Sequence, residues 1–137
     1  MMESTTMNPN QIEAPLGQFI QMNILMWNCK GALNLDFKRQ VFEMAVNYRP
    51  SIMVITETRV EGDRVEKTID GLPFDGFITT DTIGCVGGLW ILWNKEDAKI
   101  SLLASTKQEM HATIKVCALN LSWLFSAIYA STRLAER

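Results

Sequence analysis

The sequence predicts an α+β fold, built on a mixed sheet with a β-α-β start followed by antiparallel hairpins. Two short apolar runs, 24–27 and 52–55, flank a segment with helical spacing, which is the pattern of a β-α-β unit. Three further extended runs, 100–104, 112–118 and 123–129, follow one another with short polar links. Strands at such short intervals indicate an antiparallel meander, so we expect a mixed sheet rather than a doubly wound one.

The composition is that of one ordinary globular domain, with 137 residues, 47% hydrophobic residues and 20% charged residues. A net charge of −2 argues against a dedicated polyanion binder, which usually carries a clear basic excess. The three cysteines match no zinc-binding spacing and indicate reduced thiols, so we expect an intracellular location, the nucleus included. No apolar run approaches the roughly 20 residues of a membrane span, and no membrane partner is expected.

The first twenty residues show no periodicity and contain two prolines and a glycine. They also lack the basic start and apolar core of a signal peptide. We therefore predict a disordered leader over 1–20 and a folded domain over 21–137.

The segment between the first two strands has the signals of an amphipathic helix. Gly31 allows a sharp exit from the first strand, Asn34 or Asp36 can cap the helix, and Pro50 helps to end it. The apolar side chains lie at the spacing of one helical stripe, which we expect to be buried; they are Phe37, Val41, Met44, Ala45 and Tyr48.

The middle of the chain predicts a second, shorter helix over 62–70, with Gly71 as a left-handed cap. A strand is expected over 76–80, and another follows the pair Gly87–Gly88. In that later strand, alternation directs Leu89, Ile91 and Trp93 to one face and Trp90 and Leu92 to the other. The glycine pair either lets the strand start close against its neighbour or cradles a phosphate, and the first interpretation is favoured.

A polar residue follows each of the first two apolar runs, Asn28 after Trp27 and Glu57 after Thr56. A right-handed crossover brings the ends of two parallel strands to the same edge of the sheet, where α/β proteins bind ligands. Asn28 and Glu57 are therefore candidates for one shared site. A carboxylate at the end of a buried strand needs a metal or a cation, and the alternative is that Glu57 pairs with Arg59 or turns to water.

Several blocks, in one order along 22–137, resemble the endonuclease/exonuclease/phosphatase superfamily. The likeness is greatest to the endonuclease domains of LINE-type non-LTR retrotransposons, especially those of plants. The blocks are Met22–Gly31 (MNILMWNCKG), Ile55–Arg59 (ITETR), Gly87–Trp93 (GGLWILW) and Ala127–Ser131 (AIYAS), with support from Phe74–Ile78 (FDGFI) and Ala130–Arg137 (ASTRLAER).

The resemblance implies the N-terminal half of a four-layer α/β/β/α sandwich that hydrolyses phosphodiesters with Mg²⁺ or Mn²⁺. By position, Asn28 and Glu57 would belong to the metal site, with Glu57 as the direct ligand, and Tyr129 would lie near the scissile phosphate as a catalytic residue. The alternative for Tyr129 is a core tyrosine with its hydroxyl at the rim of the sheet. DNA is the expected partner if the domain is active.

The resemblance also implies elements that this chain lacks, namely a general-base Asp and a terminal Asp–His pair. No Asp follows Asp97, and His111 stands outside such a context, which indicates a structural or surface histidine. We expect a truncated, inactive endonuclease domain with weak or absent metal binding. Two alternatives are a hydrolase completed in trans, and a non-catalytic interaction module that self-associates through a sheet face left bare by a missing second sheet.

Overall fold

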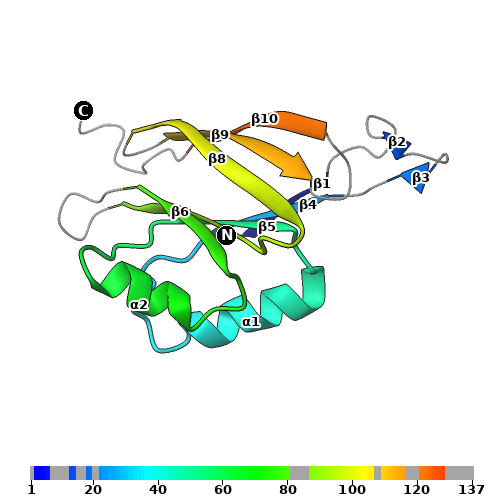
Figure 1. Ribbon diagram of the computed structural model, residues 1–137. Coiled ribbons are helices and arrows are strands. Elements are labelled where there is room, and N and C mark those ends of the chain that lie inside the picture. Colours follow the sequence, from blue (N-terminus) through cyan, green and yellow to red (C-terminus); the bar gives the residue numbers. More distant parts are fainter. Residues whose placement is uncertain are drawn as a thin grey trace.

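The computed structural model describes residues 2–6, 13–14, 18–19, 22–80, 87–106, 109–116 and 121–128. Three layers are stacked in these residues (Figure 1). The middle layer is a five-stranded sheet in the order β1 (Met2–Thr6), β4 (Asn23–Asn28), β5 (Ile52–Thr56), β7 (Leu89–Trp93) and β6 (Gly76–Thr79). The predicted α+β class is confirmed.

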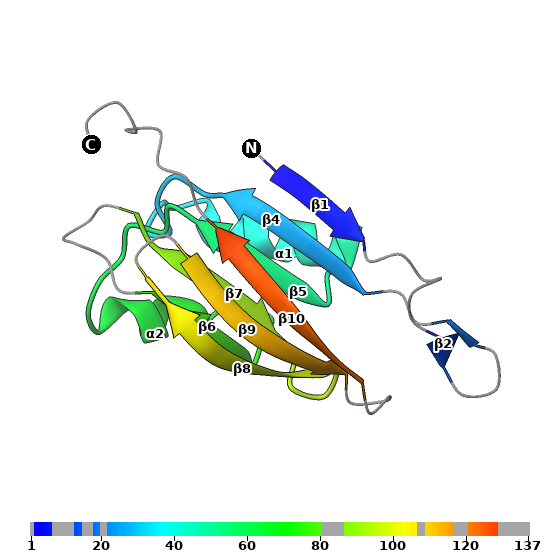
Figure 2. The same cartoon turned by 90° about the horizontal axis from the view of Figure 1, so that it is seen from above.

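The outer layers lie on opposite faces of that sheet. Helices α1 (Phe37–Tyr48) and α2 (Arg64–Asp70) cover one face, and a three-stranded sheet covers the other (Figure 2). The three-stranded sheet has the order β10 (Leu121–Ile128), β9 (Glu109–Val116) and β8 (Ala98–Ser105). A separate antiparallel pair consists of β2 (Glu13–Ala14) and β3 (Gln18–Phe19). Neither α1 nor α2, the helices of the described residues, has the length and hydropathy of a membrane span.

The predicted β-α-β unit is confirmed. β4 and β5 are parallel and in register from Ile24 opposite Ile52 to Asn28 opposite Thr56, and α1 connects them. All five residues of β5 are buried, because this strand has a neighbour on each side and a packed layer on each face. The polar ends of both strands therefore lie at the same edge of the sheet.

Helix α1 follows the predicted stripe in part. Phe37, Val41 and Met44 are buried, whereas Tyr48 is 42% exposed, so the prediction that Tyr48 belongs to the core is wrong. Tyr48 is the last residue of the helix, directly before Arg49, whose left-handed conformation ends it. The Asp36 side chain does not cap the helix and instead pairs with Arg39 at 3.4 Å.

The predicted left-handed cap at Gly71 is also wrong. Gly71 has φ −81° and ψ 0°, and α2 ends in a tight turn in which the Leu72 N–H donates to the Ile69 carbonyl. That turn keeps φ negative, so it does not need the conformational freedom of glycine.

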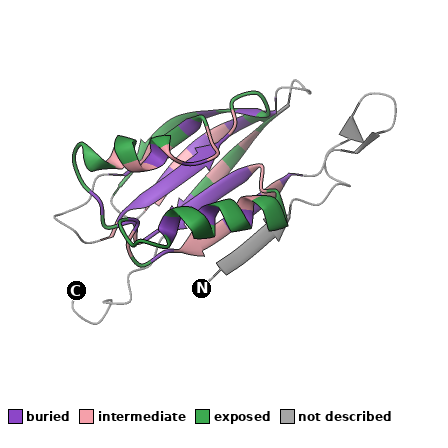
Figure 3. Cartoon of the chain, turned by 90° about the horizontal axis from the view of Figure 1, so that it is seen from below, coloured by how far each residue is buried: buried purple, intermediate pink, exposed green. Residues whose placement is uncertain are grey.

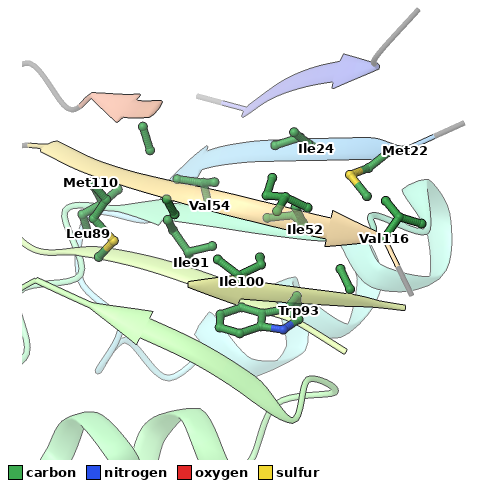
Figure 4. Close-up of a cluster of buried hydrophobic side chains, with 14 residues drawn as sticks. Met22, Ile24, Ile52, Val54, Leu89, Ile91, Trp93, Ile100, Met110 and Val116 are labelled. Atoms are coloured by element: carbon green, nitrogen blue, oxygen red, sulfur yellow. The ribbon is translucent and has the colours of Figure 1, made fainter. Parts of the chain in front are cut away.

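Strand β7 divides its side chains between two hydrophobic cores as its alternation predicts. Leu89, Ile91 and Trp93 face the three-stranded sheet, and Trp90 and Leu92 face the helices. Figure 4 shows the core between the sheets, and Figure 3 shows that the buried residues concentrate in the central strands. Burying one such large apolar side chain contributes about 1.5–3 kcal/mol before entropy is deducted.

The expectation of a bare sheet face is wrong. The predicted meander forms, but β8, β9 and β10 make a sheet of their own that packs on the inner face of the first sheet. Met110, Ala112 and Ile114 of β9 have no exposed surface and share a core with Ile52 and Val54 of β5. The alternation of apolar residues in β9 explains this second layer, because one face of the strand must be buried.

The segment for which a disordered leader is predicted contains one described strand that joins the main sheet. Met2–Thr6 forms β1, which pairs antiparallel with β4. The reason is the free edge of β4, whose backbone N–H and C=O groups can pair with any extended segment that reaches them. The division of the chain at residue 21 stays a prediction.

Candidate functional site

Asn28 and Glu57 lie at neighbouring strand ends. Asn28 is the last residue of β4 and stands opposite Thr56, and Glu57 follows Thr56 directly. Backbone hydrogen bonds continue past both strands, from Cys29 N–H to the Thr56 carbonyl at 3.1 Å and from Gly31 N–H to the Glu57 carbonyl at 2.9 Å. The two exit loops are thus joined side by side, and this edge of the sheet is the candidate site.

The backbone at this edge is strained. Lys30, Glu57 and Arg59 have φ values of 54°, 53° and 54°, a left-handed conformation that costs a residue with a side chain about 1–2 kcal/mol. Among the described residues, the only other non-glycine residue with positive φ is Arg49, which ends α1. Strain of this kind gathers at functional sites, where the surrounding structure holds it in place.

A third segment, Gly87–Gly88, joins the same edge at the start of β7. Both glycines have positive φ, 76° and 104°. The Gly88 carbonyl accepts a hydrogen bond from Thr58 N–H at 3.4 Å, and the Gly87 carbonyl accepts one from Arg59 N–H at 2.8 Å. These contacts support the interpretation that the pair lets β7 start close against its neighbour.

The Glu57 carboxylate has a cationic partner. Its Oε1 lies 3.2 Å from Nη2 of Arg59, and the Glu57 side chain is only 12% exposed, against 44% for Arg59. Arg59 Nη1 also donates to the Lys30 carbonyl at 3.5 Å, which bridges the two exit loops. The alternative in which Glu57 pairs with Arg59 is therefore the state that the structure shows.

The amide of Asn28 stabilises its own loop. Its Oδ1 accepts a hydrogen bond from Lys30 N–H at 3.2 Å, which is a turn typical of asparagine and holds Lys30 in its left-handed conformation. This contact leaves the Asn28 oxygen at the strand end, on the same edge as Glu57.

Cys29 is also part of the site, a role that its sequence context did not indicate. Its Sγ–H donates to the Glu57 carbonyl at 3.5 Å, and burial of the thiol raises its pKa to about 11. A buried, protonated thiol acts as a packing and hydrogen-bonding group rather than as a nucleophile. Its position directly after Asn28 was the available signal.

The oxygen donors at this edge are of the kind that Mg²⁺ takes. Mg²⁺ prefers oxygen ligands, keeps several waters and needs only one or two carboxylates. The Glu57 carboxylate and the amide oxygen of Asn28 are therefore suitable as the protein's part of its coordination shell. A closed cage is not formed, because no group of three or more His, Cys, Asp or Glu residues that could hold a metal occurs in the described part of the chain. Arg59 would have to release the carboxylate oxygen for metal binding.

The remaining predicted site residues lie elsewhere. Tyr129 falls outside the described residues, since β10 is described to Ile128. His111 lies within β9 between the buried Met110 and Ala112, so its side chain is on the opposite, outer face of the second sheet. A surface position for His111 is what the sequence indicated.

Two solved structures resemble this fold. An AP endonuclease, LMAP from Leishmania major, matches with a TM-score of 0.61 and 11% sequence identity, over 79% of this chain and 40% of its own. A humanized TDP2 from D. rerio carrying 14 mutations matches with a TM-score of 0.51 and 12% identity, over 84% of this chain and 50% of its own. The chain therefore spans half or less of these structures. No protein-family model matches the sequence, and neither does any curated protein.

Proposed function

We propose, from the endonuclease/exonuclease/phosphatase-like fold that the chain shares with both of these structures, that it derives from a metal-dependent phosphodiesterase and is inactive alone. In this proposal it is a truncated endonuclease domain of retroelement origin that retains part of the metal site. The observation that carries the proposal is the meeting of Asn28 and Glu57 at two joined strand ends with strained backbone at Lys30, Glu57 and Arg59.

In the intact domain, Glu57 and Asn28 would hold Mg²⁺ or Mn²⁺, which polarises a phosphoryl oxygen and stabilises the leaving oxyanion. Arg59 orients the Glu57 carboxylate through the 3.2 Å ion pair until the metal ion takes the place of the guanidinium. Its exposed guanidinium can then contact a phosphate of DNA, the expected partner, since a guanidinium matches a phosphate with two parallel hydrogen bonds. Tyr129 would lie near the scissile phosphate.

The inactivity follows from the groups that the chain lacks. Activation of water needs a general base and an Asp–His pair, yet no Asp follows Asp97. The single histidine, His111, is hydrogen-bonded to Ser126 and Glu109 on the second sheet. General acid–base groups typically contribute about 10²–10⁴-fold to a rate. The effects of residues that act as a unit are not additive, so the absence of one removes most of the contribution of the others. Weak metal binding and negligible turnover are expected.

A nicking assay tests this proposal. Purified chain is incubated with supercoiled plasmid and Mg²⁺ or Mn²⁺, beside Glu57→Gln and a matched control, Glu61→Gln, which changes an exposed carboxylate four residues away. No nicking above the metal alone is expected, and weak Mn²⁺ binding, followed by electron paramagnetic resonance, should be lost only in Glu57→Gln. Sustained nicking that Glu57→Gln abolishes and Glu61→Gln preserves would overturn the proposal of an inactive chain.

The second candidate is a hydrolase completed in trans, which is supported by the match of this chain to only 40% and 50% of the two similar structures. Completion across two copies would make nicking rise more steeply than linearly with chain concentration. Size-exclusion chromatography would show the corresponding dimer, and a monomer at all concentrations would argue against it. The proposed truncation is tested separately, by searching the nucleotide sequence downstream of Arg137 for an in-frame continuation.

A further inference from the structure

Three polar side chains meet on the outer face of the second sheet, away from the strand ends already described. His111 stands opposite Ser126 in the pairing of β9 with β10, and Glu109 lies two residues before His111 on the same face of β9. Met110 and Ala112, which alternate with them, are buried against the first sheet. The cluster therefore faces outward, with side-chain exposures of 35% for His111 and 43% for Glu109.

Both nitrogens of the imidazole have a partner. His111 Nδ1 lies 2.7 Å from Ser126 Oγ, and Nε2 lies 3.3 Å from Glu109 Oε2. When Nδ1 carries the proton and donates to the hydroxyl, the lone pair of Nε2 faces the carboxylate. In this tautomer the two electron-pair donors repel each other, and a cation beside them removes the repulsion; in the other tautomer, Nε2–H donates to Glu109 and the Ser126 hydroxyl donates to Nδ1.

We propose that His111 Nε2 and Glu109 Oε2 are two ligands of a divalent transition-metal site, suited to Zn²⁺ or Cu²⁺, whose other positions are taken by water. Zinc binds imidazole nitrogen and carboxylate oxygen at about 2.0–2.2 Å. Two such ligands at a tetrahedral angle stand roughly 3.3–3.4 Å apart. The separation of 3.3 Å between Nε2 and Oε2 matches that spacing.

Ser126 has a positioning role in this site. A metal-bound imidazole usually donates its other N–H to an oxygen, which sets the tautomer and the orientation of the ring. The 2.7 Å contact from Nδ1 to Ser126 Oγ supplies this support from the neighbouring strand. An imidazole ligand also selects Zn²⁺ and Cu²⁺ over Mg²⁺, so this site differs in chemistry from the oxygen donors at Asn28 and Glu57.

The single histidine of the chain makes a direct test possible. Long-range ¹H–¹⁵N NMR of the imidazole during a Zn²⁺ titration reports Nδ1 and Nε2 separately. We expect a saturable one-to-one change at Nε2 with Zn²⁺, none with the same concentration of Mg²⁺, and the same result in a Cys85→Ser, Cys117→Ser background that removes competing thiols.

Variants separate the ligands from general charge effects. Glu109→Gln and Ser126→Ala should each weaken Zn²⁺ binding by about tenfold or more. Glu96→Gln, which removes an equal charge from the exposed turn before β8, should leave the affinity unchanged. Because all three changes are on the surface, thermal unfolding without metal should be unaltered. An affinity unchanged by Glu109→Gln, a change at Nδ1 instead of Nε2, or equal binding of Mg²⁺ would overturn the proposal.

Discussion

Gly76, the first residue of β6, is closed to any side chain by its neighbour on β7. It stands opposite Trp93, and a Cβ added at Gly76 would lie 2.5 Å from Cε2 and 2.8 Å from Nε1 of that indole. Real Cβ atoms do not approach other atoms so closely, so Gly76→Ala must displace either the ring or the strand. Trp93 is 5% exposed and belongs to the core between the sheets, where it has little room to move.

The expected loss is about 1–2 kcal/mol in the free energy of unfolding. Overpacking a core costs about 1–3 kcal/mol, and a Gly→Ala change regains about 0.4–1 kcal/mol by restricting the unfolded chain. Gly71→Ala is the matched control, because Gly71 has φ −81° and its added Cβ would meet only the end of the Lys38 side chain, at 3.5 Å. We expect Gly71→Ala to be neutral or stabilising.

Urea denaturation followed by circular dichroism measures both variants. A double-mutant cycle with Trp93→Leu then isolates the clash, since the penalty of Gly76→Ala should disappear when the ring is absent. A Gly76→Ala variant as stable as Gly71→Ala, or a penalty that persists in the Trp93→Leu background, would show that the ring does not exclude a Cβ at Gly76.

Three further predictions concern the second sheet and the edge of the site. Ile114→Ala, at a position with no exposed surface, should lower the free energy of unfolding by about 2–5 kcal/mol. Leu124→Ala, at 69% exposure on the outer face, should change it by less than about 0.5 kcal/mol. Equal effects in denaturation experiments would contradict the packing of the second sheet on the first. Because burial raises the pKa of Cys29 from 9.0 to about 11, the folded thiol keeps its proton in a range where the unfolded thiol loses it. The free energy of unfolding should therefore fall by up to about 2.7 kcal/mol as pH rises from about 9 to about 11. Cys29→Ala should remove that part of the pH dependence. A pH profile that Cys29→Ala leaves unchanged would speak against a buried thiol. The Thr58 hydroxyl is buried with no hydrogen-bond partner among the described residues, so Thr58→Val should leave the protein equally or more stable in thermal unfolding, and a loss above about 1 kcal/mol would reveal a bonded hydroxyl.

Most of the strands and both helices of the described residues follow from local patterns. The alternation in Leu89–Trp93 predicts two faces because successive side chains of a strand point to opposite sides, and the structure confirms both cores. The spacing of Phe37, Val41 and Met44 likewise predicts the buried stripe of α1. Tyr48 and Gly71 were misassigned because the end of a helix depends on what covers it and on how its last turn closes.

The candidate site could be located, but not its bonding. Asn28 and Glu57 stand out as polar residues after apolar runs, and the handedness of a β-α-β crossover is sufficient to bring them to one edge. The sequence left open whether Glu57 binds a metal, pairs with Arg59 or turns to water, and only the tertiary structure, with a 3.2 Å contact between Glu57 and Arg59, shows the pairing. Cys29 had no distinguishing signal beyond its place in the chain.

Periodicity and turn residues were enough to determine the type and order of the described elements from β4 onward, since these depend on contacts between near neighbours. The tertiary structure decided which strands share a sheet, that β8, β9 and β10 form a separate layer over the first, and that His111 meets Ser126 while Trp93 meets Gly76. The residues of these two pairs are 15 and 17 positions apart and belong to different strands. Their register is set by the burial of whole sheet faces, which no local pattern contains.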